Sequence, residues 1–227
     1  MLLPLKDDNP TLTFPFVTVG LILANGWVFF HQISLDVVES QRFIFQWGAI
    51  PYQIMTGDAL YGPSSVPVYF TLISSMFLHG GFLHIFGNML YLWIFGNNIE
   101  DTLGHFRFLL FYLVCGLSAA LAQVFSSPGS TVPMIGASGA VAGILGAYLL
   151  LFPGARVVTL FIIIIFIKFI RLPALVVLGF WFFVQLLGTL GGAISNVAFF
   201  AHIGGFVVGL TLVKVFQPGW SKRRRRY

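Results

Sequence analysis

Six long apolar stretches constrain the fold of this chain more than any other feature of its sequence. They cover residues 14–30, 82–99, 106–125, 138–152, 172–190 and 197–216. A helix that crosses a bilayer needs about 20 mostly apolar residues. Charged residues make up only 8% of the chain, whereas a soluble domain has about 25%. The sequence therefore predicts an all-α integral membrane protein, a bundle of six transmembrane helices.

A seventh apolar run, residues 157–170, is too short to cross a membrane. It contains Lys168, and Arg171 follows it directly. This length favours a re-entrant or interfacial segment that leads into the fifth helix. We expect one membrane domain at 14–216, between a cytoplasmic N-terminus at 1–13 and a basic cytoplasmic tail at 217–227.

The positions of the Lys and Arg residues predict the orientation of the bundle, because these residues stay on the cytoplasmic side. With six spans and the N-terminus inside, Arg42 is the only one of the 12 that falls outside. Both termini are then cytoplasmic in a multi-pass protein of the plasma or inner membrane. The basic run 222–226 is typical of contact with membrane lipid, and we expect no nucleic-acid partner.

The connection after the first span, residues 31–69, is predicted to lie outside and to associate with the membrane surface. Its density of aromatic residues suits the headgroup region. The aromatic residues that carry this prediction are Phe43, Phe45, Trp47, Tyr52, Tyr61 and Tyr69. Cys115 is the only cysteine of the chain, so neither an internal disulfide nor a thiolate metal cluster is possible.

A few polar side chains lie at membrane depth, where each is costly and indicates function. The spans contain no Asp or Glu in their interiors, which argues against a carboxylate-based proton or cation transporter. Spans two, four and six all run from outside to inside, and the polar residues lie near their starts, in the outer half of the bilayer. These residues are His84 and Asn88 on span two, Ser138 on span four and His202 on span six, with His79 just before span two.

Glycine spacing predicts that spans four and six pack closely. Gly139 and Gly143 are four residues apart, as are Gly205 and Gly209. This small-xxx-small spacing brings membrane helices together. Such contact would place Ser138 within reach of His202.

The fourth span is too short to cross the hydrocarbon core. Its 15 residues from Ser138 to Phe152 make about 22 Å of helix, against a core of about 30 Å. Ser138 then begins its helix roughly 8 Å below the outer boundary. Because irregular backbone at that depth must line water or be buried in protein, we expect a wet cavity with Ser138 on its floor.

These residues suit acyl-transfer chemistry without a metal or cofactor. A serine becomes nucleophilic when a base accepts its proton, and neutral His202 is such a base. The Ser138 backbone N–H, the Asn88 amide and the His84 imidazole could stabilise the oxyanion. No span offers an acid to orient the base, so a Ser-His dyad is predicted rather than a triad.

Three motifs resemble those of the rhomboid intramembrane serine proteases: "HGGFLHIFGN", "GASGA" and "AHIGGFVVG". They occur in the family's order on the second, fourth and sixth spans. The resemblance implies a six-helix bundle that hydrolyses peptide bonds in or near transmembrane segments of its protein substrates. It makes Ser138 the nucleophile and His202 the base, with His84, Asn88 and the Ser138 amide as the oxyanion hole. The residues expected to be structural are His79, Gly136, Gly139, Gly205, Gly209 and Glu100.

The chain departs from the family pattern at three places. Phe70 and Thr71 stand where many members have a Trp-Arg pair that anchors the outer loop. Ala142 stands where an aromatic residue often stacks on the catalytic histidine, so something else must orient His202. The segment 157–170 also makes the connection between spans four and five unusually long.

Other interpretations of the same residues remain open. Ser138 alone could be a packing residue, and His84 and Asn88 could be hydrogen-bonding residues between helices. The chain could be a catalytically inactive relative that binds membrane proteins, although such relatives usually lack the serine or the histidine. A small transporter or channel is disfavoured by the uncharged spans and by the absence of an inverted repeat.

Overall fold

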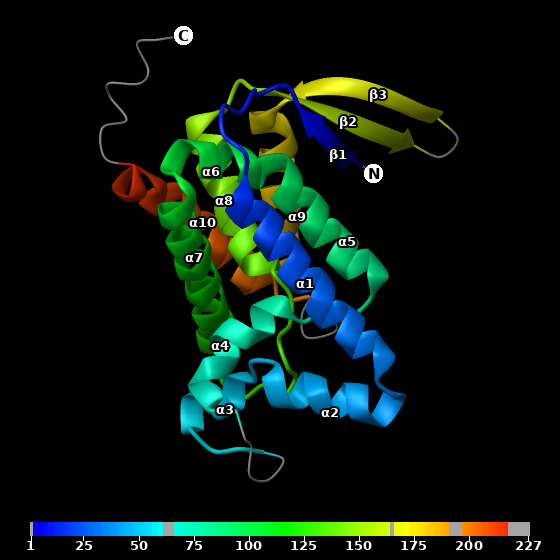
Figure 1. Ribbon diagram of the computed structural model, residues 1–227, viewed down its shortest axis with the longest axis vertical. Helices are drawn as coiled ribbons and strands as arrows, with labels where there is room; N and C mark the ends of the chain where they lie inside the picture. The colour runs from blue at the N-terminus through cyan, green and yellow to red at the C-terminus, as the bar shows by residue number, and fades with distance from the viewer. Residues whose placement is uncertain (1, 61–65, 164–165, 191–196, 218–227) are drawn as a thin grey trace.

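A computed structural model describes residues 2–60, 66–163, 166–190 and 197–217 of the chain, and the helices form one bundle (Figure 1). The helices of the bundle are α1 (Phe16–Ser34), α5 (Phe82–Tyr91), α6 (Asn97–Leu103), α7 (His105–Ser126), α8 (Ser138–Leu151), α9 (Ala174–Leu190) and α10 (Phe199–Phe216). A turn of π-helix, η3 (Leu92–Gly96), joins α5 to α6. Each predicted span thus corresponds to a helix, or to a joined pair, that begins and ends within about one turn of the expected residues.

Length and composition support a multi-pass membrane protein. Within the described residues α1, α7 and α10 are each long and apolar enough to cross a bilayer. The segments Val68–Phe77 and Phe82–Leu103 together make a fourth candidate, bent by 82°. Helices α8 and α9 are apolar but have only 14 and 17 residues. The count of six spans therefore stays a prediction.

Apart from residues 164–165, which lie outside the described residues, the apolar run 157–170 forms β-strands, and its expected place as a re-entrant or interfacial segment stays a prediction. It belongs to strands β2 (Arg156–Ile163) and β3 (Phe166–Pro173), which pair antiparallel, and β1 (Leu2–Asp7) adds to β2. The all-α prediction is wrong at this place. An apolar run has no period that separates helix from strand, and the Val, Ile and Phe residues of this run favour a strand.

Asp7 fastens the N-terminal strand to the bundle. Its Oδ2 accepts hydrogen bonds from Tyr148 Oη of α8 at 2.6 Å and from Asn98 Nδ2 of α6 at 2.8 Å. Burial raises the pKa of the Asp7 carboxyl, and these two hydrogen bonds oppose the rise. Strand β1, which lies within the predicted N-terminal segment 1–13, is therefore an integral part of the fold.

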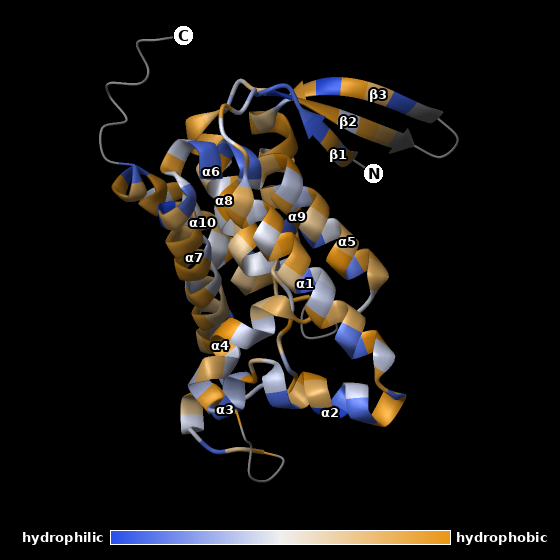
Figure 2. Ribbon diagram, viewed as in Figure 1, coloured by the Kyte–Doolittle hydropathy of each residue, from blue (hydrophilic) through white to orange (hydrophobic). Residues whose placement is uncertain are grey.

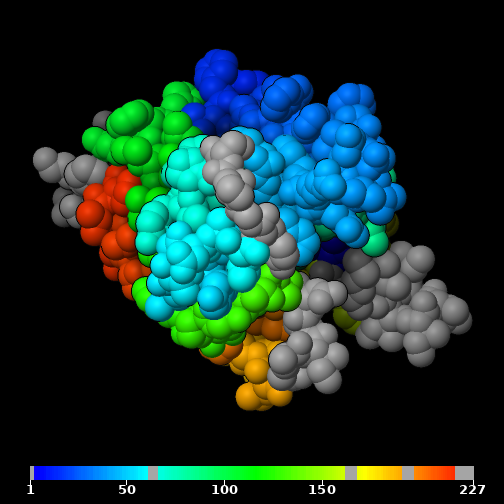
Figure 3. Space-filling view, turned by 90° about the horizontal axis from the view of Figure 1, so that it is seen from below, coloured from blue at the N-terminus to red at the C-terminus, as the bar shows by residue number. Residues whose placement is uncertain are grey.

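Different elements of the chain lie at the two ends of the bundle. The sheet and the C-terminal end of α10 lie at one end (Figure 1). The opposite end is covered by α2 (Val37–Trp47), α3 (Pro51–Thr56) and α4 (Thr71–Ser74), which dominate the view in Figure 3. Trp47 packs edge-on against Phe70 there, with ring centroids 6.4 Å apart. The basic tail from residue 218 onward lies outside the described residues.

The helices consist mostly of hydrophobic residues, as the colours of Figure 2 show, and many of their large apolar side chains are exposed. Leu83 is 89% exposed, Trp27 73% and Phe106 72%. Exposure of such large apolar side chains is unfavourable in water. A lipid environment removes this cost, which agrees with a membrane location.

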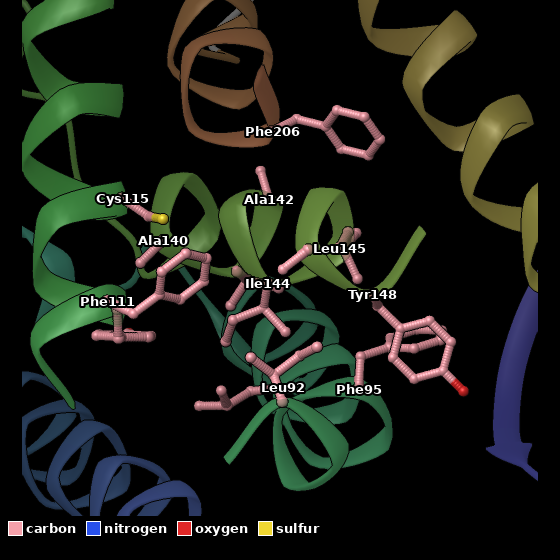
Figure 4. Packing of buried hydrophobic residues seen from close by; sticks show 14 of the residues in the cluster. Leu92, Phe95, Phe111, Cys115, Ala140, Ala142, Ile144, Leu145, Tyr148 and Phe206 are labelled. Carbon is pink, nitrogen blue, oxygen red and sulfur yellow. The ribbon is translucent and has the colours of Figure 1, made fainter. Parts of the chain in front are cut away.

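Helix α8 forms the centre of the bundle. Ten consecutive residues, from Gly139 to Tyr148, are buried. Figure 4 shows Cys115 of α7 beside Ala140 and Phe206 of α10 on the side of Ala142, while Leu92 and Phe95 of η3 pack from the opposite side. The position of α8 therefore sets the position of every residue at its N-terminus.

Glycines let the backbones of α8 and α10 touch. A Cβ atom on Gly209 would collide with the carbonyl oxygen of Gly143, and one on Gly205 would collide with that of Gly139. Helix α7 meets the same crossing, since a Cβ atom on Gly139 would lie only 2.5 Å from Ala119 Cβ. The two predicted glycine pairs thus lie at one helix crossing.

Replacement of Gly209 tests this crossing. We expect Gly209→Ala to lower the stability of the folded protein by about 1–3 kcal/mol, because α8 and α10 must separate to admit the methyl group. Gly20→Ala on α1 is the matched control, since nothing lies within 4 Å of the added Cβ there. Thermal unfolding in detergent micelles measures both. Equal unfolding temperatures for the two variants would contradict the close crossing.

Candidate active site

Ser138 and His202 are in contact at the N-terminal turns of α8 and α10. His202 Nε2 lies 2.8 Å from Ser138 Oγ, although the two residues are 64 positions apart in the chain. Ser138 is the first residue of α8, and His202 lies in the first turn of α10, which starts at Phe199. The glycine crossing holds these two turns together. The structure thus brings together the nucleophile and base that the sequence suggests.

Helix α9 supplies the groups that orient the imidazole. Gln185 Oε1 lies 2.8 Å from His202 Nδ1. The Trp181 ring, one turn earlier, lies beside the imidazole with centroids 5.8 Å apart and an interplanar angle of 38°. Trp181 therefore contributes an aromatic contact from α9, where Ala142 of α8 has none to offer.

Sequence reasoning missed both of these residues, although a signal was present. Gln185 is a polar residue in the fifth apolar run, and Trp181 precedes it by four positions. That spacing puts both side chains on one helix face. Neither residue fits the expected pattern, because Gln185 is not an acid and Trp181 lies on α9 rather than at the position of Ala142.

His84 and Asn88 of α5 both approach Gly136, two residues before Ser138. Gly136 has a φ of 120°. A Cβ atom there would lie 2.7 Å from His84 Nε2 and 3.6 Å from Asn88 Nδ2. Gly136 therefore combines a left-handed backbone with a close approach of two polar groups, and both features exclude a larger residue.

The hydrogen bonding of these two side chains leaves donors next to Gly136. The Gly80 N–H donates to His84 Nδ1 at 3.2 Å. A neutral imidazole that accepts at Nδ1 carries its hydrogen on Nε2, the atom that approaches Gly136. Asn88 is 7% exposed, and its Nδ2 has no hydrogen-bond partner among the described residues. Such a buried, unpaired donor is costly and suits a site that an acceptor enters.

A small cavity adjoins the serine. Its volume is about 40 Å³, and the residues that line it include Ser75, Met76, Gly136 and Ser138. A site of this size admits a water molecule, which needs about 10–15 Å³. A larger apolar hollow of about 370 Å³ lies between α1 and α5, lined by residues such as Val19 and Trp93. It contains none of the predicted site residues.

His79 lies beside the site without touching Ser138 or His202. Its ring meets that of His84 edge-on, with centroids 5.0 Å apart. Its backbone N–H donates to Gln32 Oε1 at 3.0 Å, and its carbonyl accepts from Gln32 Nε2 at 3.2 Å. These bonds join the segment before α5 to the end of α1, so the contacts of His79 suit a supporting role.

Glu100 lies at the other end of the bundle, fully buried. Its Oε1 accepts from the Val17 N–H at 2.9 Å, and its Oε2 accepts from the Thr18 N–H and Oγ1, both at 2.7 Å. His105 Nδ1 lies 2.5 Å from Oε1. Because α1 begins at Phe16, the carboxylate caps its N-terminus, where backbone N–H groups lack partners and negative charge is favoured.

In the part of the chain that the structure describes, no three His, Cys, Asp or Glu side chains come together as metal ligands would.

The Rhomboid domain family matches residues 67–218. The chain belongs to the rhomboid family. This match confirms the predicted family and contains all the predicted site residues. "Rhomboid protease GluP" of Bacillus subtilis (strain 168) is 35% identical over 90% of this chain and 34% of its own length. "RHOMBOID-like protein 1" of Arabidopsis thaliana is 28% identical over 94% of this chain and 57% of its length.

A third relative of this rhomboid chain, "Rhomboid protease AarA" of Providencia stuartii, is 34% identical over 58% of the chain and 49% of its own length. The chain therefore spans between about a third and somewhat more than half of these relatives. Two of the three are named as proteases. Membership of the rhomboid family and the apolar helices together make this a multi-pass membrane protein of a serine protease family.

Replacement of Glu100 tests its role as a cap in this rhomboid domain. We expect Glu100→Ala to cost at least about 2 kcal/mol, because the N–H groups of Val17 and Thr18 lose a charged acceptor and stay buried. The neighbouring Asp101→Ala is the matched control, since the bonds of Asp101 to Thr13 are exposed. It should cost less than about 1 kcal/mol. Thermal unfolding in micelles compares the two, and an equal loss would contradict the cap.

Proposed function

We propose that this rhomboid protein is an intramembrane serine endopeptidase, which hydrolyses peptide bonds in or near the transmembrane segments of membrane-anchored proteins. The observation that carries the proposal is the 2.8 Å contact of Ser138 Oγ with His202 Nε2. A serine and a histidine in this relation form the nucleophile and base of acyl-transfer enzymes. The proteases named among the relatives support the same reaction.

The first half of the reaction acylates Ser138. His202 Nε2 accepts the hydroxyl proton while Oγ attacks the carbonyl carbon of the scissile bond. The C–O bond forms, the carbonyl electron pair moves to oxygen, and a tetrahedral intermediate results. Collapse of this intermediate breaks the C–N bond, and the imidazolium returns its proton to the leaving amine. The acyl group remains on Ser138.

The second half releases the product. His202 takes a proton from a water molecule while the water oxygen attacks the acyl carbon. The second tetrahedral intermediate collapses with cleavage of the bond between the acyl carbon and Ser138 Oγ, the imidazolium returns its proton to Oγ, and the carboxylic acid product leaves. The cavity beside Ser138 is large enough to admit that water. Serine, histidine and water account for every bond in the cycle, so the proposal calls for neither a metal nor a cofactor.

The oxyanion of each intermediate forms near Gly136 in this proposal. Asn88 Nδ2 and His84 Nε2 both lie beside this residue, and the Ser138 N–H stands in the first turn of α8, where helix amides lack intrahelical acceptors. Donors that are already in place need no reorganisation as charge develops. The unpaired Asn88 donor is what makes this assignment specific.

Charge and topology support a site that opens to the outer side of a plasma or inner membrane. Lys6, Arg156 and Arg171 lie in or beside the sheet, at the end of the bundle away from α2–α4. The positive-inside rule puts that end, with both termini, in the cytoplasm. The partners are then transmembrane protein substrates and membrane lipid, without nucleic acid.

Loss of either dyad residue tests the proposal. We expect Ser138→Ala and His202→Ala each to abolish nearly all cleavage, because the nucleophile and its base act as one unit. The assay reconstitutes each variant in liposomes with a tagged single-span protein and follows the cut fragment. The matched controls are Ser126→Ala and His31→Ala, which replace the same types of residue elsewhere in the chain. We expect both to keep wild-type cleavage. Undiminished cleavage by the dyad variants would overturn the mechanism.

A separate substitution tests the oxyanion site. We expect Asn88→Ala to lower kcat about 100- to 1,000-fold with little change in KM, since its donor acts on charge that appears only in the transition state. The control is Asn97→Ala, further along the same span. An unchanged kcat in folded protein would remove Asn88 from the oxyanion site.

A further inference from the structure

We propose that Gln185 is a positioning residue, whose carboxamide fixes both the tautomer and the orientation of the His202 imidazole. This inference rests on the proposed function of the same site. It assigns a role to a residue of α9, a helix that the Ser138–His202 contact does not itself involve.

The two ends of the Gln185 carboxamide are held by different partners. Nε2 donates to the backbone carbonyl of Trp181, one turn back in α9, at 3.2 Å. With its nitrogen held there, the carboxamide presents its oxygen to the imidazole, and Oε1 lies 2.8 Å from His202 Nδ1. The bond within α9 thus determines which end of the side chain faces the histidine.

That orientation determines the tautomer of His202. An amide oxygen only accepts hydrogen bonds, so Nδ1 must carry the imidazole hydrogen. In a neutral imidazole Nε2 is then an acceptor, and Nε2 is the atom 2.8 Å from Ser138 Oγ. The opposite tautomer would place a hydrogen on Nε2 and could not accept the serine proton.

The burial of Gln185 makes the orientation of its carboxamide harder to change. Gln185 is only 7% exposed, and a buried amide is costly unless its polar groups are paired. Both of its polar ends have the partners named above, so rotation of the buried carboxamide would break two hydrogen bonds. The Trp181 ring beside the imidazole also restricts rotation of the histidine.

A carboxamide differs from an acid in one respect that matters here. Because the carboxamide is uncharged, it orients the imidazole without stabilising the protonated imidazolium. A carboxylate in its place would stabilise that charged form. Within the described residues, no hydrogen bond or ion pair joins His202 to a carboxylate. A second titratable side chain of the site, His84 of α5, approaches Gly136. Gln185 therefore does the orienting work of the third member of a triad and adds no charge inside the membrane.

The tautomer can be read directly by ¹⁵N NMR of the imidazole in detergent micelles, with the His202 signals assigned by their loss in His202→Asn. We expect the wild-type ring to carry its hydrogen on Nδ1. Gln185→Met, which keeps the length of the side chain but removes the acceptor, should give a mixture of tautomers. A wild-type ring protonated on Nε2, or an unchanged tautomer in Gln185→Met, would overturn the inference. This result does not depend on proteolysis, so it is distinct from failure of the proposed function.

Kinetics supply a second readout. We expect Gln185→Met to lower kcat about tenfold to a hundredfold at nearly constant KM, because a misaligned base slows proton transfer rather than binding. Gln185→Glu restores an acceptor and should recover kcat at high pH. Its carboxylate favours the protonated imidazole, however, which cannot act as the base. As the pH is lowered, this variant should therefore lose activity at a higher pH than the wild type does.

The matched control is Gln123→Met on α7. Gln123 Oε1 accepts from the Ala201 N–H at 3.4 Å and thus contacts α10 next to His202 but not the imidazole. We expect wild-type kcat and a wild-type pH profile for this variant. A Gln185→Met variant that kept the wild-type kcat and pH profile, or a Gln123→Met variant with the same loss, would overturn the positioning role.

Discussion

The backbone contact between α8 and α10 is the interaction on which the candidate site depends. Because Gly205 and Gly209 have no side chains, α10 rests directly on carbonyl groups of α8. The first turns of the two helices then meet, and Ser138 and His202 come within hydrogen-bond distance. An added methyl group at this crossing would be too close to those carbonyl groups, so the two helices would have to shift relative to each other. Packing and chemistry therefore depend on the same small residues.

The described site uses uncharged polar groups, which suits its environment. A charge in the interior of a bilayer is costly, and the serine, the two histidines, Asn88 and Gln185 can all act as neutral groups. The two carboxylates that are buried among the described residues lie near the other end of the bundle, where Glu100 caps α1 and Asp7 bonds the N-terminal strand to α6 and α8. The proposed chemistry thus occurs in a part of the protein where hydrogen bonds, rather than ion pairs, hold the side chains in position.

Sequence reasoning found what depends on local pattern. Apolar length located the helices, and the start of α8 at Ser138 followed from the glycine-rich motif. It failed where structure depends on distant pairing, because the run 157–170 has no period and its partner β1 lies more than a hundred residues away. It also missed Gln185: a polar residue in an apolar run marks a candidate, but the partner of that side chain depends on the rotation of α9 about its own axis, which the sequence does not give.

Reaction with a fluorophosphonate tests the central claim most directly, because the reagent modifies serines that a neighbouring base activates. The folded protein would be treated in micelles and the adduct located by mass spectrometry. The account predicts a single adduct on Ser138 that disappears in His202→Ala. A folded protein that stays unmodified at Ser138, or one that is modified there equally well without His202, would contradict it.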